Sequence, residues 1–201
     1  MSEIVVQAFV TLDGVSQAPG GADEDREGGF EHGGWQQGYD IGELIVEWES
    51  RTEALLLGRK TYDIWSQSWA VWNEDAPGLM GELTRRYNRV PKFVASRTQT
   101  EFSWKNTNLL DMDVAAAVSR LRDEPGGEIR VWGSTELIRT LAENDLIDEY
   151  RIVTYPLILG SGKKLFADGF PVTKLALVDS YEHPAGVVVS TYRRADVDLS
   201  N

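Results

Sequence analysis

The stretch that decides the fold is residues 54–65, Ala-Leu-Leu-Leu-Gly-Arg-Lys-Thr-Tyr-Asp-Ile-Trp. It begins with a short apolar run that ends at Gly58, and such a run is typical of a buried parallel strand. Thr61 then stands where it can cap a following helix. The stretch therefore predicts a strand that turns directly into a helix, which is the repeating unit of an α/β protein.

The same alternation continues on both sides of this stretch. Further strands are predicted at Ile4–Leu12, Lys92–Ala95, Asn108–Leu110 and Glu128–Trp132. Helices are indicated at Glu43–Arg51, around Leu79–Tyr87, after a cap at Asp113 and around Leu137–Leu141. The last strands are predicted at Glu149–Tyr155, Lys174–Ser180 and Val187–Tyr192, with a turn at 183–186. We therefore expect a single domain over residues 1–201, with a mostly parallel mixed sheet, helices on both faces and an antiparallel C-terminal hairpin.

Composition excludes several classes of function. The 201 residues contain 32 Asp and Glu against 20 Lys and Arg, and the net charge of −12 argues against binding nucleic acid. The chain has no Cys and only 2 His, so no disulfide, cysteine nucleophile or metal site is expected. No apolar run is long enough to span a bilayer, and the N-terminus lacks the features of a signal peptide. We expect a cytoplasmic protein that does not bind membranes.

Glycine is concentrated between Gly14 and Gly42, a segment that also holds several acids. Such a composition predicts a long, mobile loop that cannot pack a core by itself. It is either a lid over a site, within Ser16–Gly38, or a solvated insertion. The acids from Asp23 to Glu27 lack the ligand spacing of a calcium loop, so we interpret them as solvated.

Four polar turns follow predicted strands, where an open α/β sheet binds its ligands. Residues 58–61 combine a glycine, two cations and the start of a helix, which suits a phosphate. Residues 96–98, Ser-Arg-Thr, suit a phosphate monoester, and residues 133–136, Gly-Ser-Thr-Glu, suit a pyrophosphate at a helix whose cap is Ser134 or Thr135. Residues 13–15 can form one wall of a cleft. Each is also explained as an ordinary turn, but their order along successive strands is more specific than any one of them.

Five segments carry a resemblance to a known family. They are VTLDGV from residue 10, LLLGRKTYDIW from 55, FVASRT from 93, VWGSTELIRTL from 131 and DEYRIVTYPLILGSGKKLF from 148. Together they resemble the dihydrofolate reductase superfamily, in the branch similar to the C-terminal reductase domain of the bifunctional riboflavin-biosynthesis deaminase/reductase. The resemblance implies a three-layer fold with a central sheet of about eight strands, and NADPH as hydride donor.

The resemblance also implies a role for individual residues in binding the cofactor. Gly58, Arg59 and Thr61 would meet its phosphates, and Ser96 and Arg97 would lie beside the 2′-phosphate of its adenosine. The pyrophosphate would be lined by Gly133, Ser134, Thr135 and Glu136, and the nicotinamide would be bordered by Ala8, Asp13 and Gly14. Dihydrofolate reductases have a Gly-Gly pair where this chain has Gly133-Ser134.

The catalytic and substrate residues are less well marked. Dihydrofolate reductases hold the pterin with a carboxylate on the first helix, for which the candidates here are Glu43 and Asp40. Neither lies in a recognisable motif, which argues against folate reduction, and Glu43 is equally explained as a solvent-facing acid in a first helical turn.

Tryptophans and hydroxyls supply the candidate substrate contacts. Trp65, Trp69 and Trp72 have the spacing of one helix face and either pack or line a pocket for a flat heterocycle, with Trp65 nearest the cofactor. Thr154 and Tyr155 either turn their hydroxyls into the cleft or serve as strand formers.

Two functions remain open from the sequence. The first is an NADPH-dependent reductase that transfers a hydride to a small unsaturated heterocycle of the pyrimidine or pterin type. The alternative is a non-catalytic NADP(H)-binding or interaction protein with the same fold. A second copy of the chain, forming a homodimer, is the expected macromolecular partner.

Overall fold

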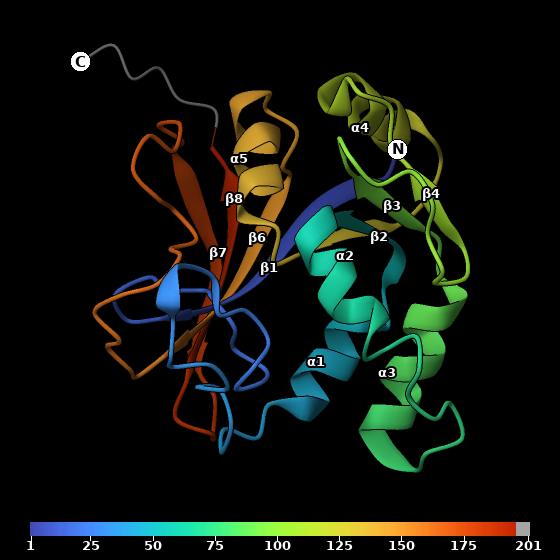
Figure 1. Cartoon of the computed structure of the whole chain (residues 1–201). Helices are drawn as coiled ribbons and strands as arrows, with labels where there is room; N and C mark the ends of the chain where they lie inside the picture. Colours follow the sequence, from blue (N-terminus) through green and yellow to red (C-terminus); the bar gives the residue numbers. More distant parts are fainter. Residues whose placement is uncertain (196–201) are drawn as a thin grey trace, which may run out of the picture.

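The computed structural model describes residues 1–195 and contains one eight-stranded sheet between two layers of helices (Figure 1). The strands are β1 (Glu3–Thr11), β2 (Thr52–Gly58), β3 (Lys92–Ala95), β4 (Thr107–Leu109), β5 (Glu128–Trp132), β6 (Glu149–Tyr155), β7 (Leu175–Glu182) and β8 (Val188–Arg194). The helices are α1 (Gly42–Glu49), α2 (Arg59–Ser66), α3 (Gly78–Arg89), α4 (Val114–Asp123) and α5 (Thr135–Glu143), with one 3-10 turn at Glu27–Gly29. The predicted elements are confirmed, with most boundaries displaced by one or two residues.

The strand order is β4-β3-β2-β5-β1-β6-β8-β7. β1 is central and pairs in parallel with both β5 and β6, whereas β8 pairs antiparallel with β6 and with β7. The predicted mixed, mostly parallel sheet with an antiparallel C-terminal hairpin is therefore confirmed. This order brings the carboxyl ends of β1, β2, β3 and β5 to one edge, where ligands bind in such sheets.

Each face of the sheet is covered by different helices. α4 and α5 pack on an aliphatic face, to which β1 contributes Ile4, Val6, Ala8 and Val10. α1, α2 and α3 cover the other face, which is rich in aromatic residues. Alternate residues of β1 face opposite sides because successive side chains of a strand point in opposite directions. Within residues 1–195, no helix is long and apolar enough to cross a membrane.

The glycine-rich segment between β1 and α1 contributes to the core, contrary to its interpretation as a solvated insertion. Val15, Phe30, Trp35 and Ile41 are all buried in the cluster beneath α1 and α3. The indole N–H of Trp35 donates to the carbonyl of Gln17 at 2.7 Å. The solvated-insertion alternative was wrong because it weighed the glycines and acids and overlooked the large apolar side chains spaced between them.

Helix caps agree with the prediction at one of three positions. The Asp113 carboxylate accepts the backbone N–H of Ala116 at 3.0 Å and caps α4, as predicted. α2 and α5 have no side-chain cap, so the caps predicted at Thr61 and at Ser134 or Thr135 are wrong. The hydroxyls of Thr61 and Ser134 join the two helix starts to each other instead.

Candidate functional site

A cleft of about 2340 Å³ lies over the carboxyl ends of β1, β2, β3 and β5. Its walls include most of the residues predicted to bind a cofactor or substrate: Ala8, Asp40, Gly58, Arg59, Thr61, Trp65, Ser96, Arg97, Gly133, Ser134, Thr135 and Glu136. The predicted residues that do not line it are Asp13, Gly14, Glu43, Thr154 and Tyr155. Three of the four polar turns found in the sequence therefore converge on one cavity.

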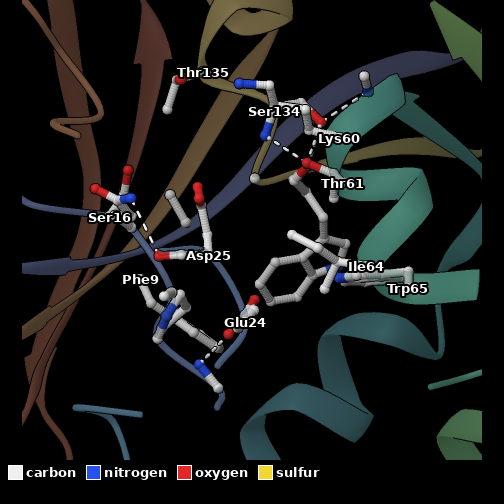
Figure 2. Close-up of a pocket in the computed structure, with 18 of the residues that line it drawn as sticks. Phe9, Ser16, Glu24, Asp25, Lys60, Thr61, Ile64, Trp65, Ser134 and Thr135 are labelled. Carbon is white, nitrogen blue, oxygen red and sulfur yellow. Dashed lines mark hydrogen bonds between the residues drawn. The ribbon is translucent and has the colours of Figure 1, made fainter. Parts of the chain in front are cut away.

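The turns after β2 and β5 are joined by a compact hydrogen-bonded contact (Figure 2). The Ser134 hydroxyl accepts the backbone N–H of Gly58 at 2.8 Å, and the Thr61 hydroxyl accepts the backbone N–H of Ser134 at 3.0 Å. Gly133 has φ of 51°, and a Cβ there would lie 2.9 Å from the Thr61 hydroxyl oxygen. A side chain at this position would therefore force the two turns apart.

The starts of α2 and α5 form a concave, amide-rich edge of the cleft. Neither helix has a side-chain cap, so no capping side chain accepts a hydrogen bond from the N–H groups of its first turn. Such helix starts favour anions. Arg59 and Lys60 add positive charge at the start of α2. The residues present at this edge fit the phosphates of a dinucleotide.

Both cations at the start of α2 have acidic partners. Arg59 donates to Asp63 at 2.6 Å, one helical turn further on. Lys60 forms an ion pair with Glu27 of the glycine-rich segment. The positive charge at this edge is thus partly neutralised by the protein itself.

The turn after β3 contributes Ser96 and Arg97 to the rim of the cleft. The Ser96 hydroxyl accepts the backbone N–H of Gln99 at 2.8 Å and of Thr98 at 3.3 Å, which fixes the shape of the turn. The Arg97 side chain is exposed. An exposed guanidinium on a rigid turn is suited to a phosphate that enters from solvent.

An aromatic wall faces these polar turns. The ring of Trp65 lies 5.0 Å from that of Tyr87 and 5.8 Å from that of Trp132, between ring centroids. Trp69 lies 4.8 Å from Tyr87 and 4.6 Å from Trp72. All five side chains line the cleft, so its wide end can accept a flat ring.

The spacing of the three tryptophans predicted that they share one helix face, and this prediction is wrong. α2 ends at Ser66, and Trp69 and Trp72 lie in the turns that follow it. Their contacts with one another come from this irregular segment folding back against α3, which carries Tyr87. The intervals of four and three residues between these tryptophans do not show where the helix ends.

The acids of the glycine-rich segment were predicted to be solvated, but two of them form ion pairs. Glu27 forms ion pairs with both Lys60 and Lys163, and Asp25 accepts from Lys163 at 2.6 Å. The contacts with Lys163 and then Lys60 lower the pKa of Glu27 to about 2. These ion pairs connect the segment to α2 on one side of the cleft and to residues 160–165 on the other.

Asp13 does not line the cleft and instead fixes a neighbouring loop. Its carboxylate accepts the Thr11 hydroxyl at 2.6 Å and the backbone N–H groups of Gly160 at 2.8 Å and Leu159 at 3.2 Å. The Thr11 hydrogen bond, followed by that of Gly160, lowers its pKa to about 2. Gly14 accepts the backbone N–H of Leu165 at 3.0 Å. These two residues hold the 159–165 stretch against the end of β1.

The strand residues Thr154 and Tyr155 are also outside the cleft wall. Tyr155 is fully buried, and its ring packs on those of Phe9, Trp35 and Tyr39 at 5.1 to 5.8 Å. Within residues 1–195 its hydroxyl has no hydrogen-bond partner. Burial raises its pKa, so it stays neutral. Its position supports the interpretation of Tyr155 as a strand former rather than a cleft residue.

The two candidate catalytic acids occupy different surroundings. Glu43 is exposed in the first turn of α1 and does not line the cleft, in agreement with its interpretation as a solvent-facing acid. Asp40 lines the cleft, and its carboxylate accepts the backbone N–H of Gly42 at 3.4 Å.

Sequence reasoning missed the buried acid of α1, Glu49. Its carboxylate accepts the Thr52 hydroxyl at 2.8 Å and the indole N–H of Trp132 at 2.9 Å, directly behind the aromatic wall. Burial raises its pKa. Its spacing of four residues from the buried Ile45 was the available signal, because it places Glu49 on the same helix face.

Comparisons with known proteins agree with this architecture. The model of the RibD C-terminal domain family matches residues 2–189. The Bacillus subtilis protein YyaP is 30% identical over 193 residues, which cover 94% of this chain and 93% of YyaP. The Bacillus subtilis protein YwjB is 31% identical over 85 residues, 42% of this chain and 49% of YwjB.

Two solved structures share the fold. A protein of Shewanella sp. PV-4, whose name provisionally assigns it to riboflavin biosynthesis, has a TM-score of 0.68 at 21% identity and covers 96% of this chain and 99% of its own. A pyrimidine reductase-like protein of Corynebacterium diphtheriae has a TM-score of 0.57 at 13% identity and covers 97% of this chain and 92% of its own. With the family match over residues 2–189, the chain belongs to the RibD C-terminal domain family.

Proposed function

We propose that this protein is an NADPH-dependent reductase that transfers a hydride to a small unsaturated heterocycle of the pyrimidine or pterin type. The observation that carries the proposal is the convergence of the turns after β2, β3 and β5 on one cleft that ends in an aromatic wall. Polar turns suit the phosphates of a dinucleotide, and aromatic rings suit a flat substrate. Membership of a reductase-like family supports the same reaction class.

The residues of this chain supply binding and orientation. The helix starts at Gly58 and Ser134, with Arg59, would hold the pyrophosphate, and Ser96 and Arg97 would face the 2′-phosphate. The reduced nicotinamide supplies the hydride when it is bound. Trp65 would then stack on the substrate ring and exclude water from the reacting atoms, which favours hydride transfer.

Cofactor selectivity tests this proposal. Arg97→Ala should weaken the binding of NADPH at least about tenfold, because one charge-assisted hydrogen bond contributes about 1.5–3 kcal/mol. NADH lacks the 2′-phosphate, so its affinity should change little. Both affinities can be measured from the fluorescence of the reduced nicotinamide in a titration with the purified protein.

Arg139→Ala is the matched control. It removes the same charge from an exposed position on α5 outside the cleft, where Arg139 pairs with Glu143. Equal losses for NADPH and NADH in Arg97→Ala would contradict the role assigned to the turn after β3. NADPH binding without oxidation by pterins, pyrimidines or flavins would favour the non-catalytic alternative.

A further inference from the structure

One acid of the glycine-rich segment, Glu24, reaches the cleft beside the aromatic wall. Glu24, Phe9 and Trp65 line the same cavity. Figure 2 shows Glu24 in the opening between Phe9, at the end of β1, and Trp65, on α2. Glu24 therefore lies on the wall of the cavity that a flat ring placed against Trp65 would enter.

The local backbone fixes this carboxyl group. Its Oε2 accepts the backbone N–H groups of Gly20 at 2.6 Å and Gly21 at 3.0 Å. The turn rests against Gly33, where a Cβ would lie 2.6 Å from the carbonyl oxygens of Gly21 and Ala22. Both amides bond the same oxygen, and within residues 1–195 Oε1 accepts no hydrogen bond. One oxygen is thus anchored while the other can meet a ligand.

Three other acids that line the cleft differ from Glu24 in having cationic partners. Asp25 and Glu27 are paired with Lys163, and Asp63 is paired with Arg59. A cation beside a carboxylate keeps it ionised. Glu24 has no cationic partner within residues 1–195, and burial raises its pKa despite the opposing hydrogen bonds from Gly20 and Gly21. Of these four acids, it is the one suited to carry a proton.

We propose that Glu24 is the proton donor of the reduction, an assignment that rests on the proposed function. The carbon of a substrate C=N bond gains a hydride, with its electron pair, from the reduced nicotinamide, which is oxidised. The π electrons of the C=N bond move to nitrogen, which takes the proton from Oε1 of Glu24. The substrate is reduced by two electrons, and Glu24 is left as a carboxylate that water reprotonates.

A pair of hydride acceptors distinguishes proton donation by Glu24 from a role in positioning the substrate. Quinoxaline is a flat, neutral C=N heterocycle that needs a proton as well as a hydride, whereas its N-methyl cation needs the hydride alone. NADPH oxidation by each acceptor would be measured at about pH 6 for the wild-type protein and for Glu24→Gln. We expect Glu24→Gln to slow quinoxaline reduction about 100-fold, which is the usual lower range for general acid catalysis. Reduction of the N-methyl cation should stay within about twofold.

Glu31→Gln is the matched control, because it makes the same change in the same segment at an exposed position outside the cleft. NADPH affinity, measured by fluorescence, should be unchanged in both variants. Equal slowing of both acceptors would overturn proton donation in favour of a positioning role. Reduction of the N-methyl cation but not of quinoxaline by the wild-type protein would overturn the assignment alone, whereas reduction of neither acceptor would count against the reductase. Failure to bind NADPH would overturn the proposed function directly.

Discussion

The two faces of the sheet differ in how they are stabilised, although the same strands build both. The face beneath α4 and α5 is aliphatic, and Ile129 of β5 is one of its members. On the opposite face, the next residue of the strand, Arg130, is fully buried and bonds Glu128, Gln7 and the carbonyl of Trp48. Hydrophobic burial is non-directional, whereas a buried charge requires particular partners. The aromatic wall of the cleft therefore stands on the face whose geometry is the more closely specified.

The charged cluster of this face extends across three central strands. Arg151 of β6 donates two hydrogen bonds of 2.8 Å to Glu128 and one of 2.6 Å to Glu149. Gln7 of β1 accepts from Arg130 at 2.5 Å. Further along the same strands and on the same face lie Phe9 and Trp132, whose rings are 5.1 Å apart. The charged cluster thus fixes the strands that carry the aromatic end of the cleft.

Removing a charge from the buried cluster should have the largest effect on the free energy of unfolding. Arg130→Met removes the cation while leaving Glu128 and Gln7 in place, and loss of one partner from a buried ion pair costs about 3–5 kcal/mol. The free energy of unfolding, from urea denaturation followed by circular dichroism, measures this loss. A change below about 1 kcal/mol would show that the cluster adds little over apolar packing.

Lowering the pH should progressively reduce the stability that the charged cluster contributes. Burial tends to raise the pKa of Glu128, but Arg151 and Arg130 outweigh it and the pKa is lowered from 4.5. A lowered folded-state pKa stabilises the protein above the unfolded-state pKa, and this contribution is lost as the pH falls through the folded-state pKa. The difference in unfolding free energy between the wild type and Glu128→Gln should therefore shrink between about pH 5 and about pH 2. A constant difference over this range would contradict the assignment.

A substitution on the aliphatic face should have the smallest effect on the free energy of unfolding. Ile129→Val removes one buried methylene and should cost about 0.5–1.5 kcal/mol. The same denaturation experiment measures it, and NADPH affinity should not change because Ile129 does not line the cleft. If this loss equalled that of Arg130→Met, the two faces would not differ in the way proposed.

Much of the fold could be predicted because it depends on local patterns. The run Ala54–Leu57 with Gly58 predicted β2 and its turn, and Asp113 predicted the cap of α4. Polar turns after strands predicted which residues meet at one sheet edge, since parallel strands share their carboxyl ends. Those features need no information from distant parts of the chain.

Contacts between distant residues could not be predicted in this way. Thr61 and Ser134 are each plausible helix caps in sequence, yet they bond each other across 73 positions. Asp13 has the sequence position of a cleft residue but binds the amide of Gly160. A polar side chain takes whichever partner the tertiary structure brings within hydrogen-bond distance, and spacing along the chain does not identify that partner.

The amino-acid sequence by itself determined the α/β alternation, the family and the turns that border the cleft, because periodicity and turn chemistry act over a few residues. Only the tertiary structure decided that Phe30 and Trp35 enter the core, that Glu49 lies behind Trp132 and that Glu24 reaches the cavity. These outcomes depend on packing and desolvation, which are set by residues far apart in the chain and become defined only when the sheet has formed.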